Sequence, residues 1–179
     1  MLAERIGSSQ LAELAAQGAS LSESLHAADL PRVHAVVARE APDGTLATRV
    51  DFSGGPESFP VVAIEVHGVL PLVCQRCLGA VAWPVNVDVT LTAVPGEAAA
   101  QELADPFDSV LLDSDGTLHL RDAVEDEILA TLPLAPLHAD RRDCRAGAVA
   151  GEGAAAAQVH RPFADLGTLL GRGGPRDGH

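Results

Sequence analysis

Two runs of alternating apolar and polar residues flank a Cys-x-x-Cys motif, and this arrangement limits the fold more than any other feature of the chain. The first run covers residues 61–70 and the second covers residues 85–92. Alternation with a period of two is typical of a half-buried β-strand, because successive side chains of a strand point to opposite faces. The sequence therefore predicts a hairpin of two strands with Cys74 and Cys77 at its tip.

The remaining periodic segments predict helices and further strands around this hairpin. Apolar residues three and four positions apart indicate one or two short helices within residues 9–30 and a helix over residues 122–132. In the latter, Asp122 is expected to cap the N-terminus and Glu125 to complete the capping box. Residues 33–38 and 47–52 alternate and predict two paired strands, with a Pro-Asp-Gly turn between them.

These segments together predict an α+β fold, in which a mainly antiparallel β-sheet carries N-terminal, central and C-terminal helices. With 179 residues, 47% of them hydrophobic, the chain can bury a substantial core. We expect one α+β domain over residues 1–145, within which the acidic stretch 95–115 is a loop. Residues 146–160 predict a flexible Ala/Gly-rich loop, residues 161–171 a C-terminal docking helix, and residues 172–179 a disordered tail.

The charge balance and the missing motifs exclude several classes of protein. A formal net charge of -13 disfavours non-specific binding of nucleic acids and favours a basic protein partner, although a local arginine patch could still contact RNA. The sequence shows neither a membrane span nor a secretory signal. Three cysteines are an odd number and do not suit a scaffold of paired disulfides. We therefore expect a cytoplasmic protein. The chain has no lysine, and therefore no phosphate-binding GxxxxGK loop, and it lacks a GxSxG elbow or an HExxH pair. We therefore expect neither an enzyme nor a small-molecule substrate.

The Cys-x-x-Cys motif supports three interpretations. A structural zinc site needs four ligands, and Cys74, Cys77, His138 and Cys144 could form a Cys3His site if the fold brings them together. The thiols could instead have a packing or partner-contact role. They could also form a redox pair, but a thioredoxin-like motif precedes a helix, whereas a strand is predicted to follow here.

Four blocks of the sequence, taken together, resemble the YceD family of large ribosomal RNA subunit accumulation proteins. They are Val-Cys-Gln-Arg-Cys-Leu at 73–78, Val-Glu-Asp-Glu-Ile-Leu-Ala-Thr-Leu-Pro-Leu-Ala-Pro-Leu-His at 124–138, the single Cys144, and Arg-Pro-Phe-Ala-Asp-Leu at 161–166. The resemblance covers roughly residues 61–170. The resemblance implies that many relatives carry further cysteines after the second block. This chain has only Cys144 there, so a four-cysteine site is not expected.

The resemblance implies a cytoplasmic ribosome biogenesis factor required for accumulation or processing of large-subunit (23S) rRNA, without catalytic residues. Its partner would be the rRNA precursor, a basic large-subunit ribosomal protein, or both. The residues expected to contact the partner are Gln75, Arg76 and Leu78, and the other motif positions are Glu125, Glu127, Pro133 and Pro136. The alternative functions are a zinc-stabilised RNA-binding module and a dithiol oxidoreductase.

Overall fold

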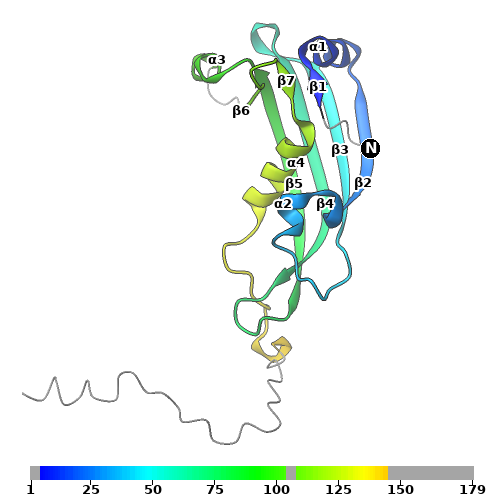
Figure 1. The fold of residues 1–179 in the computed structure, drawn as a ribbon, viewed down its shortest axis with the longest axis vertical. Coiled ribbons are helices and arrows are strands. Elements are labelled where there is room, and N and C mark those ends of the chain that lie inside the picture. Colours follow the sequence, from blue (N-terminus) through cyan, green and yellow to red (C-terminus); the bar gives the residue numbers. More distant parts are fainter. Residues whose placement is uncertain (1–4, 104–107, 145–179) are drawn as a thin grey trace, which may run out of the picture. The chain divides into compact units, whose positions relative to one another are not determined.

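A five-stranded sheet forms the centre of the described part of the protein. The structure is a computed structural model that describes residues 5–103 and 108–144. The strand order is β2-β3-β4-β5-β6, and every neighbouring pair is antiparallel except β5 and β6, which are parallel (Figure 1). The α+β fold class is therefore confirmed. The loop, helix and tail expected over residues 146–160, 161–171 and 172–179 lie outside the described residues.

The long hairpin of β4 (Pro60–Val73) and β5 (Ala80–Val94) confirms the two strands expected around the cysteines. The strands stay in register up to the pair Val73 and Ala80, so that residues 74–79 form the tip. One face of β4 carries buried residues such as Ile64 and Val66, and the other face carries the exposed Glu65 and His67. The period-two pattern of the sequence thus fixes which side chains enter the core.

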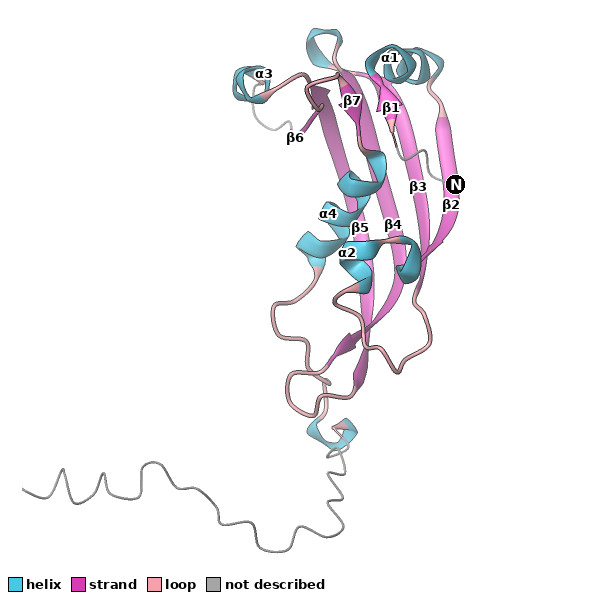
Figure 2. Ribbon diagram, viewed as in Figure 1, coloured by secondary structure: helices cyan, strands magenta, loops and turns pink. Residues whose placement is uncertain are grey.

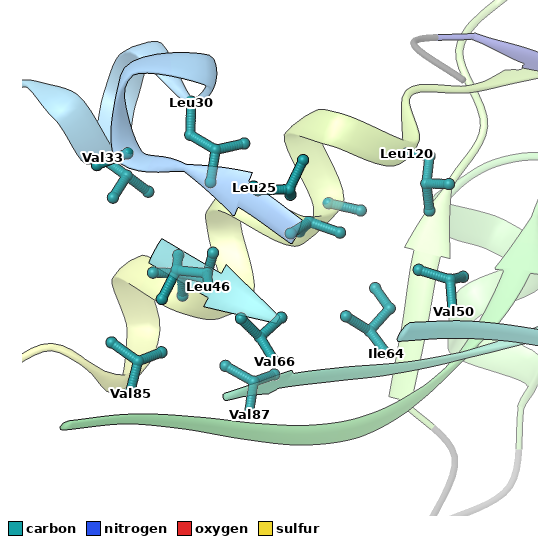
Figure 3. Close-up of a cluster of buried hydrophobic side chains, with 14 of the residues drawn as sticks. Leu25, Leu30, Val33, Leu46, Val50, Ile64, Val66, Val85, Val87 and Leu120 are labelled. Carbon is teal, nitrogen blue, oxygen red and sulfur yellow. The ribbon is translucent and has the colours of Figure 1, made fainter. Parts of the chain in front are cut away.

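Helices cover one face of this sheet. Figure 2 shows α4 (Leu120–Thr131) and the short α2 (Pro31–His34) over the same face, with α1 (Ser8–Gln17) near one end of the strands. Figure 3 shows the core that results, in which Val33 and Leu120 from the helical side approach Leu46, Ile64 and Val66 from the strands. The opposite face of β3, β4 and β5 carries mainly exposed residues. No helix of the described part is long and apolar enough to cross a membrane.

The predictions for the N-terminal third were partly wrong. The helix expected first is α1, but the second half of the expected helical region is a strand, β2 (Ser20–His26), followed by the 3-10 helix η1 (Ala27–Asp29). In β2, Leu21 and Leu25 are four residues apart, a spacing that fits a helix as well as a strand. Pairing with β3 (Thr45–Gly54) makes this segment a strand. The strand expected over residues 33–38 is absent, because α2 begins at Pro31 and only Val37 forms an isolated bridge to Leu72.

The acidic stretch after β5 is not the loop that the sequence predicts. It contains α3 (Glu97–Glu102) and β6 (Asp108–Leu111), which adds to the edge of the sheet beside β5. After a turn, β7 (Thr117–Leu118) pairs with β1 (Ile6–Gly7) and leads into α4. The expected central helix is confirmed, but its N-cap is His119, and Asp122 lies in the first turn rather than at the cap. Glu125 is buried and accepts a hydrogen bond from the backbone amide of Arg32 in α2 instead of completing a capping box.

Candidate metal centre

The tip of the β4–β5 hairpin is folded into a tight loop by its own backbone. The amide of Leu78 donates to the carbonyl of Cys74 over 2.9 Å, and the amide of Cys74 donates to the carbonyl of Gly79 over the same distance. Leu78 adopts a left-handed conformation with φ 59°, which residues other than glycine rarely do. The loop therefore brings Cys77 back toward Cys74 before β5 begins at Ala80.

The chain after α4 returns to this tip. The carbonyl of Pro136, a buried residue, accepts a hydrogen bond from the amide of Gln75 over 2.8 Å. Two residues later, Nε2 of His138 lies 3.1 Å from the carbonyl oxygen of Ala80. The 3-10 helix η3 (Arg141–Asp143) follows, capped by the Asp140 carboxylate. Cys144 comes directly after this helix, so the segment carries two further metal-binding side chains to the hairpin tip.

The four side chains meet. The ligand atoms of Cys74, Cys77, His138 and Cys144 all lie within 4.8 Å of one another. The Sγ atoms of Cys74 and Cys144 are 4.0 Å apart. Nδ1 of His138 lies 3.6 Å from the Sγ of Cys77 and 3.6 Å from the Sγ of Cys144. The Cys3His cluster, which only the fold could bring together, therefore exists.

These distances fit a tetrahedral metal ion. With sulfur at about 2.3 Å and nitrogen at about 2.05 Å from zinc, tetrahedral geometry places two sulfurs about 3.8 Å apart and a sulfur and a nitrogen about 3.6 Å apart. The contact from Nε2 of His138 to Ala80 also fits, because a proton on Nε2 leaves the lone pair of Nδ1 directed to the sulfurs. The hydrogen bond to Ala80 therefore orients the imidazole of His138 so that Nδ1 can bind a metal ion together with the three sulfurs.

The electrostatics of the tip favour the thiolate form of one ligand. Burial of Cys74 opposes its ionisation, but hydrogen bonds from the backbone amides of Arg76, Cys77 and His138 outweigh it and lower the pKa of this thiol to about 5. Burial raises the pKa of Cys144, and hydrogen bonding with Cys77 adds to this effect. Because the thiolate is the metal ligand, Cys74 is prepared to bind at neutral pH, and Cys144 gives up its proton on binding.

The other residues singled out from the sequence fall into two groups. Gln75, Arg76 and Leu78 are exposed around the tip, and Arg76 donates to the Sγ of Cys144 over 3.5 Å. Glu125 and Glu127 belong to α4 and do not join the cysteine cluster. Burial raises the pKa of Glu127, and the nearby Asp108 and Asp126 add to it.

Sequence reasoning missed a groove beside the tip. It has a volume of about 410 Å³, and its lining includes Val36, Leu129, Leu132 and the motif residues Pro133 and Pro136. Gln75 of the tip also lines it. Because these residues come from three separate segments of the chain, no local sequence pattern could have predicted that they form one surface.

A comparison with known proteins agrees with the family resemblance of the four sequence blocks. The family model described as "Large ribosomal RNA subunit accumulation protein YceD" matches residues 62–170, which include all four residues of the cluster. A relative from Haemophilus influenzae, named large ribosomal RNA subunit accumulation protein YceD, is 29% identical over 94 residues, which are 52% of this chain and 52% of that protein. The chain thus matches about half the length of this curated relative, and no solved structure matches it. Since the family model covers more than half of the chain, the protein belongs to the YceD family.

Proposed function

We propose that this protein is a ribosome biogenesis factor required for accumulation or processing of large-subunit (23S) rRNA. The observation that carries the proposal is the family match over residues 62–170, whose description names the accumulation of the large ribosomal RNA. The protein would act in the cytoplasm by binding rather than by catalysis. Its partner would be the rRNA precursor, a basic large-subunit ribosomal protein, or both.

We further propose that the Cys3His cluster holds a structural zinc ion. Three sulfurs and one imidazole nitrogen at tetrahedral spacing support this assignment. Four protein ligands leave no open position on the ion, which is the arrangement of structural rather than catalytic zinc sites. The ion would join the hairpin tip to the chain that follows α4, because two ligands come from each.

The proposed zinc site would fix the surface that makes the contact. Cys77 is flanked by Arg76 and Leu78, so locking its side chain also holds these two exposed neighbours in place. A dithiol oxidoreductase is the weaker alternative, because β5 rather than a helix follows the motif and a third thiol and an imidazole share the cluster. The geometry therefore favours a binding surface stabilised by metal.

Depletion of the protein in its own cells tests the proposed function. We expect the ratio of large-subunit to small-subunit rRNA to fall and precursors of the large-subunit rRNA to accumulate or be degraded. Wild-type protein should restore the ratio, and Cys77→Ser should restore it less than His67→Gln, a control on the exposed face of β4. An unchanged rRNA ratio and unchanged precursors after complete depletion would remove the proposal.

A further inference from the structure

The arginine side chains of the described residues divide into two groups. Arg5 pairs with Asp113, Arg32 with Asp126 and Arg49 with Asp51, and Arg121 has an interaction partner as well. The others have no acidic partner within the part of the chain that the structure describes, and they are Arg39, Arg76, Arg141 and Arg142. Acidic side chains are in excess in a protein of net charge -13. Arginines that form no ion pair with any of them in the described part of the chain are therefore unexpected.

All four arginines without an acidic partner lie at the cysteine end of the β4–β5 hairpin. Arg76 is part of the tip, and Arg141 and Arg142 form η3, directly before Cys144. Arg39 follows Ala38, whose amide donates to the carbonyl of Pro71 over 2.7 Å near the end of β4. All four side chains are exposed. We call this set, together with Leu78, the knuckle surface.

The acidic groups of this region do not neutralise the four arginines by contact. Glu40, Asp140 and Asp143 are neighbours of these arginines in sequence, and none of them forms an ion pair with an arginine in the described structure. The Asp140 carboxylate instead accepts a hydrogen bond from the backbone amide of Arg142, over 2.8 Å. The guanidinium groups of Arg39, Arg141 and Arg142 are therefore free to bind an external anion. Arg76 donates one hydrogen bond to the Sγ of Cys144 and has further N–H donors for an anion.

The chemistry of the knuckle surface fits a phosphate backbone. A guanidinium group presents several N–H donors in a planar fork that matches phosphate oxygens, and four of them in one region can contact successive phosphates. Beside them, Leu78 is 75% exposed in its left-handed conformation. An apolar side chain held outward in a strained conformation is suited to pack against an unstacked base, which single strands and loops offer and duplexes do not.

We infer that the knuckle surface binds single-stranded or looped RNA, with Arg39, Arg76, Arg141 and Arg142 on phosphates and Leu78 against a base. This inference rests on the proposed function and names the partner of the same site. The acidic remainder of the protein repels other phosphates, so binding is confined to this end of the hairpin.

Binding of a fluorescent RNA stem-loop to the full-length chain, followed by anisotropy between 50 and 200 mM salt, tests the inference. The variant Arg39→Gln, Arg141→Gln, Arg142→Gln is compared with Arg5→Gln, Arg32→Gln, Arg49→Gln, which changes the net charge equally at paired arginines. Arg76 is left intact because it contacts Cys144. Thermal melts check that both variants are folded.

We expect the knuckle variant to lose about tenfold or more in affinity and the slope of log K against log salt to fall by about 2, whereas the control keeps both. Equal losses in the two variants, or no binding by the wild-type chain at low salt, would overturn the inference. Preference for a basic protein over RNA at this surface would overturn it too. These results are separate from the depletion experiment, since depletion can lower rRNA even when the RNA contact is absent.

Discussion

The buried carboxylate of Glu125 accepts a hydrogen bond from the backbone amide of Arg32, over 2.9 Å and across 93 positions of sequence. Arg32 is in the first turn of α2, where backbone amides have no partner within the helix. Glu125 of α4 thus satisfies a donor at the start of another helix, instead of completing the capping box of its own. This contact ties a motif residue of the second half to the N-terminal third.

Replacing Glu125 should destabilise the protein through this contact. We expect Glu125→Ala to lower the free energy of unfolding by about 1–3 kcal/mol, because the Arg32 amide loses its acceptor in a partly buried position. Glu125→Gln keeps an oxygen at the same position and should cost less. Denaturant unfolding of both variants measures the difference, and equal losses would show that the hydrogen bond is not the cause.

The apolar face of α4 should contribute much of the stability of the domain. Ile128 is fully buried, so Ile128→Ala should lower the free energy of unfolding by about 2–5 kcal/mol. Leu134, shortly after the helix, is 105% exposed, and Leu134→Ala should stay within about 0.5 kcal/mol of the wild type. Chemical denaturation checks both values. Similar effects at the two positions would contradict the packing of α4 against the sheet.

Zinc should be bound in near-stoichiometric amount by protein purified without a chelator. We expect about one zinc ion per chain in the wild type and a large loss in Cys144→Ser, because that change removes one of four ligands. His67→Gln alters a histidine on the exposed face of β4 and should retain the metal. Elemental analysis decides this, and less than about a tenth of an equivalent in the wild type would reject the site.

The turn before α4 should make stability depend on pH. Hydrogen bonds from the amide of Thr117 and from the His119 ring lower the pKa of Asp113 below its ordinary value. The ionised carboxylate therefore stabilises the folded state above the unfolded pKa of about 4, and this contribution is lost as the pH falls through the folded pKa.

Asp113→Ala should accordingly melt at a lower temperature than the wild type at pH 7, and the gap should narrow below about pH 4. The control is Asp88→Ala, which removes an exposed carboxylate of β5. Melting curves across this pH range test the prediction. A gap that stays constant down to the lowest pH would show that the Asp113 charge has no part in it.

The sequence by itself determined the elements whose local pattern allows one solution. The alternation of β4 and β5 fixed the hairpin and its buried face, and the three-to-four spacing of Val124 and Ile128 fixed α4. It also placed Cys74 and Cys77 at the hairpin tip, because the motif lies between the two predicted strands. These features depend on neighbours within a few positions, which a pattern can represent.

Only the tertiary structure decided the rest. Leu21 and Leu25 fit a helix or a strand equally well, and pairing with β3 made their segment β2. The helix α2, in a segment whose alternation predicted a strand, has its first turn capped by Glu125. The meeting of His138 and Cys144 with the hairpin tip depends on the path of the chain after α4. Contacts between residues tens of positions apart set each outcome, and local patterns carry no information about which distant partner offers the lowest free energy.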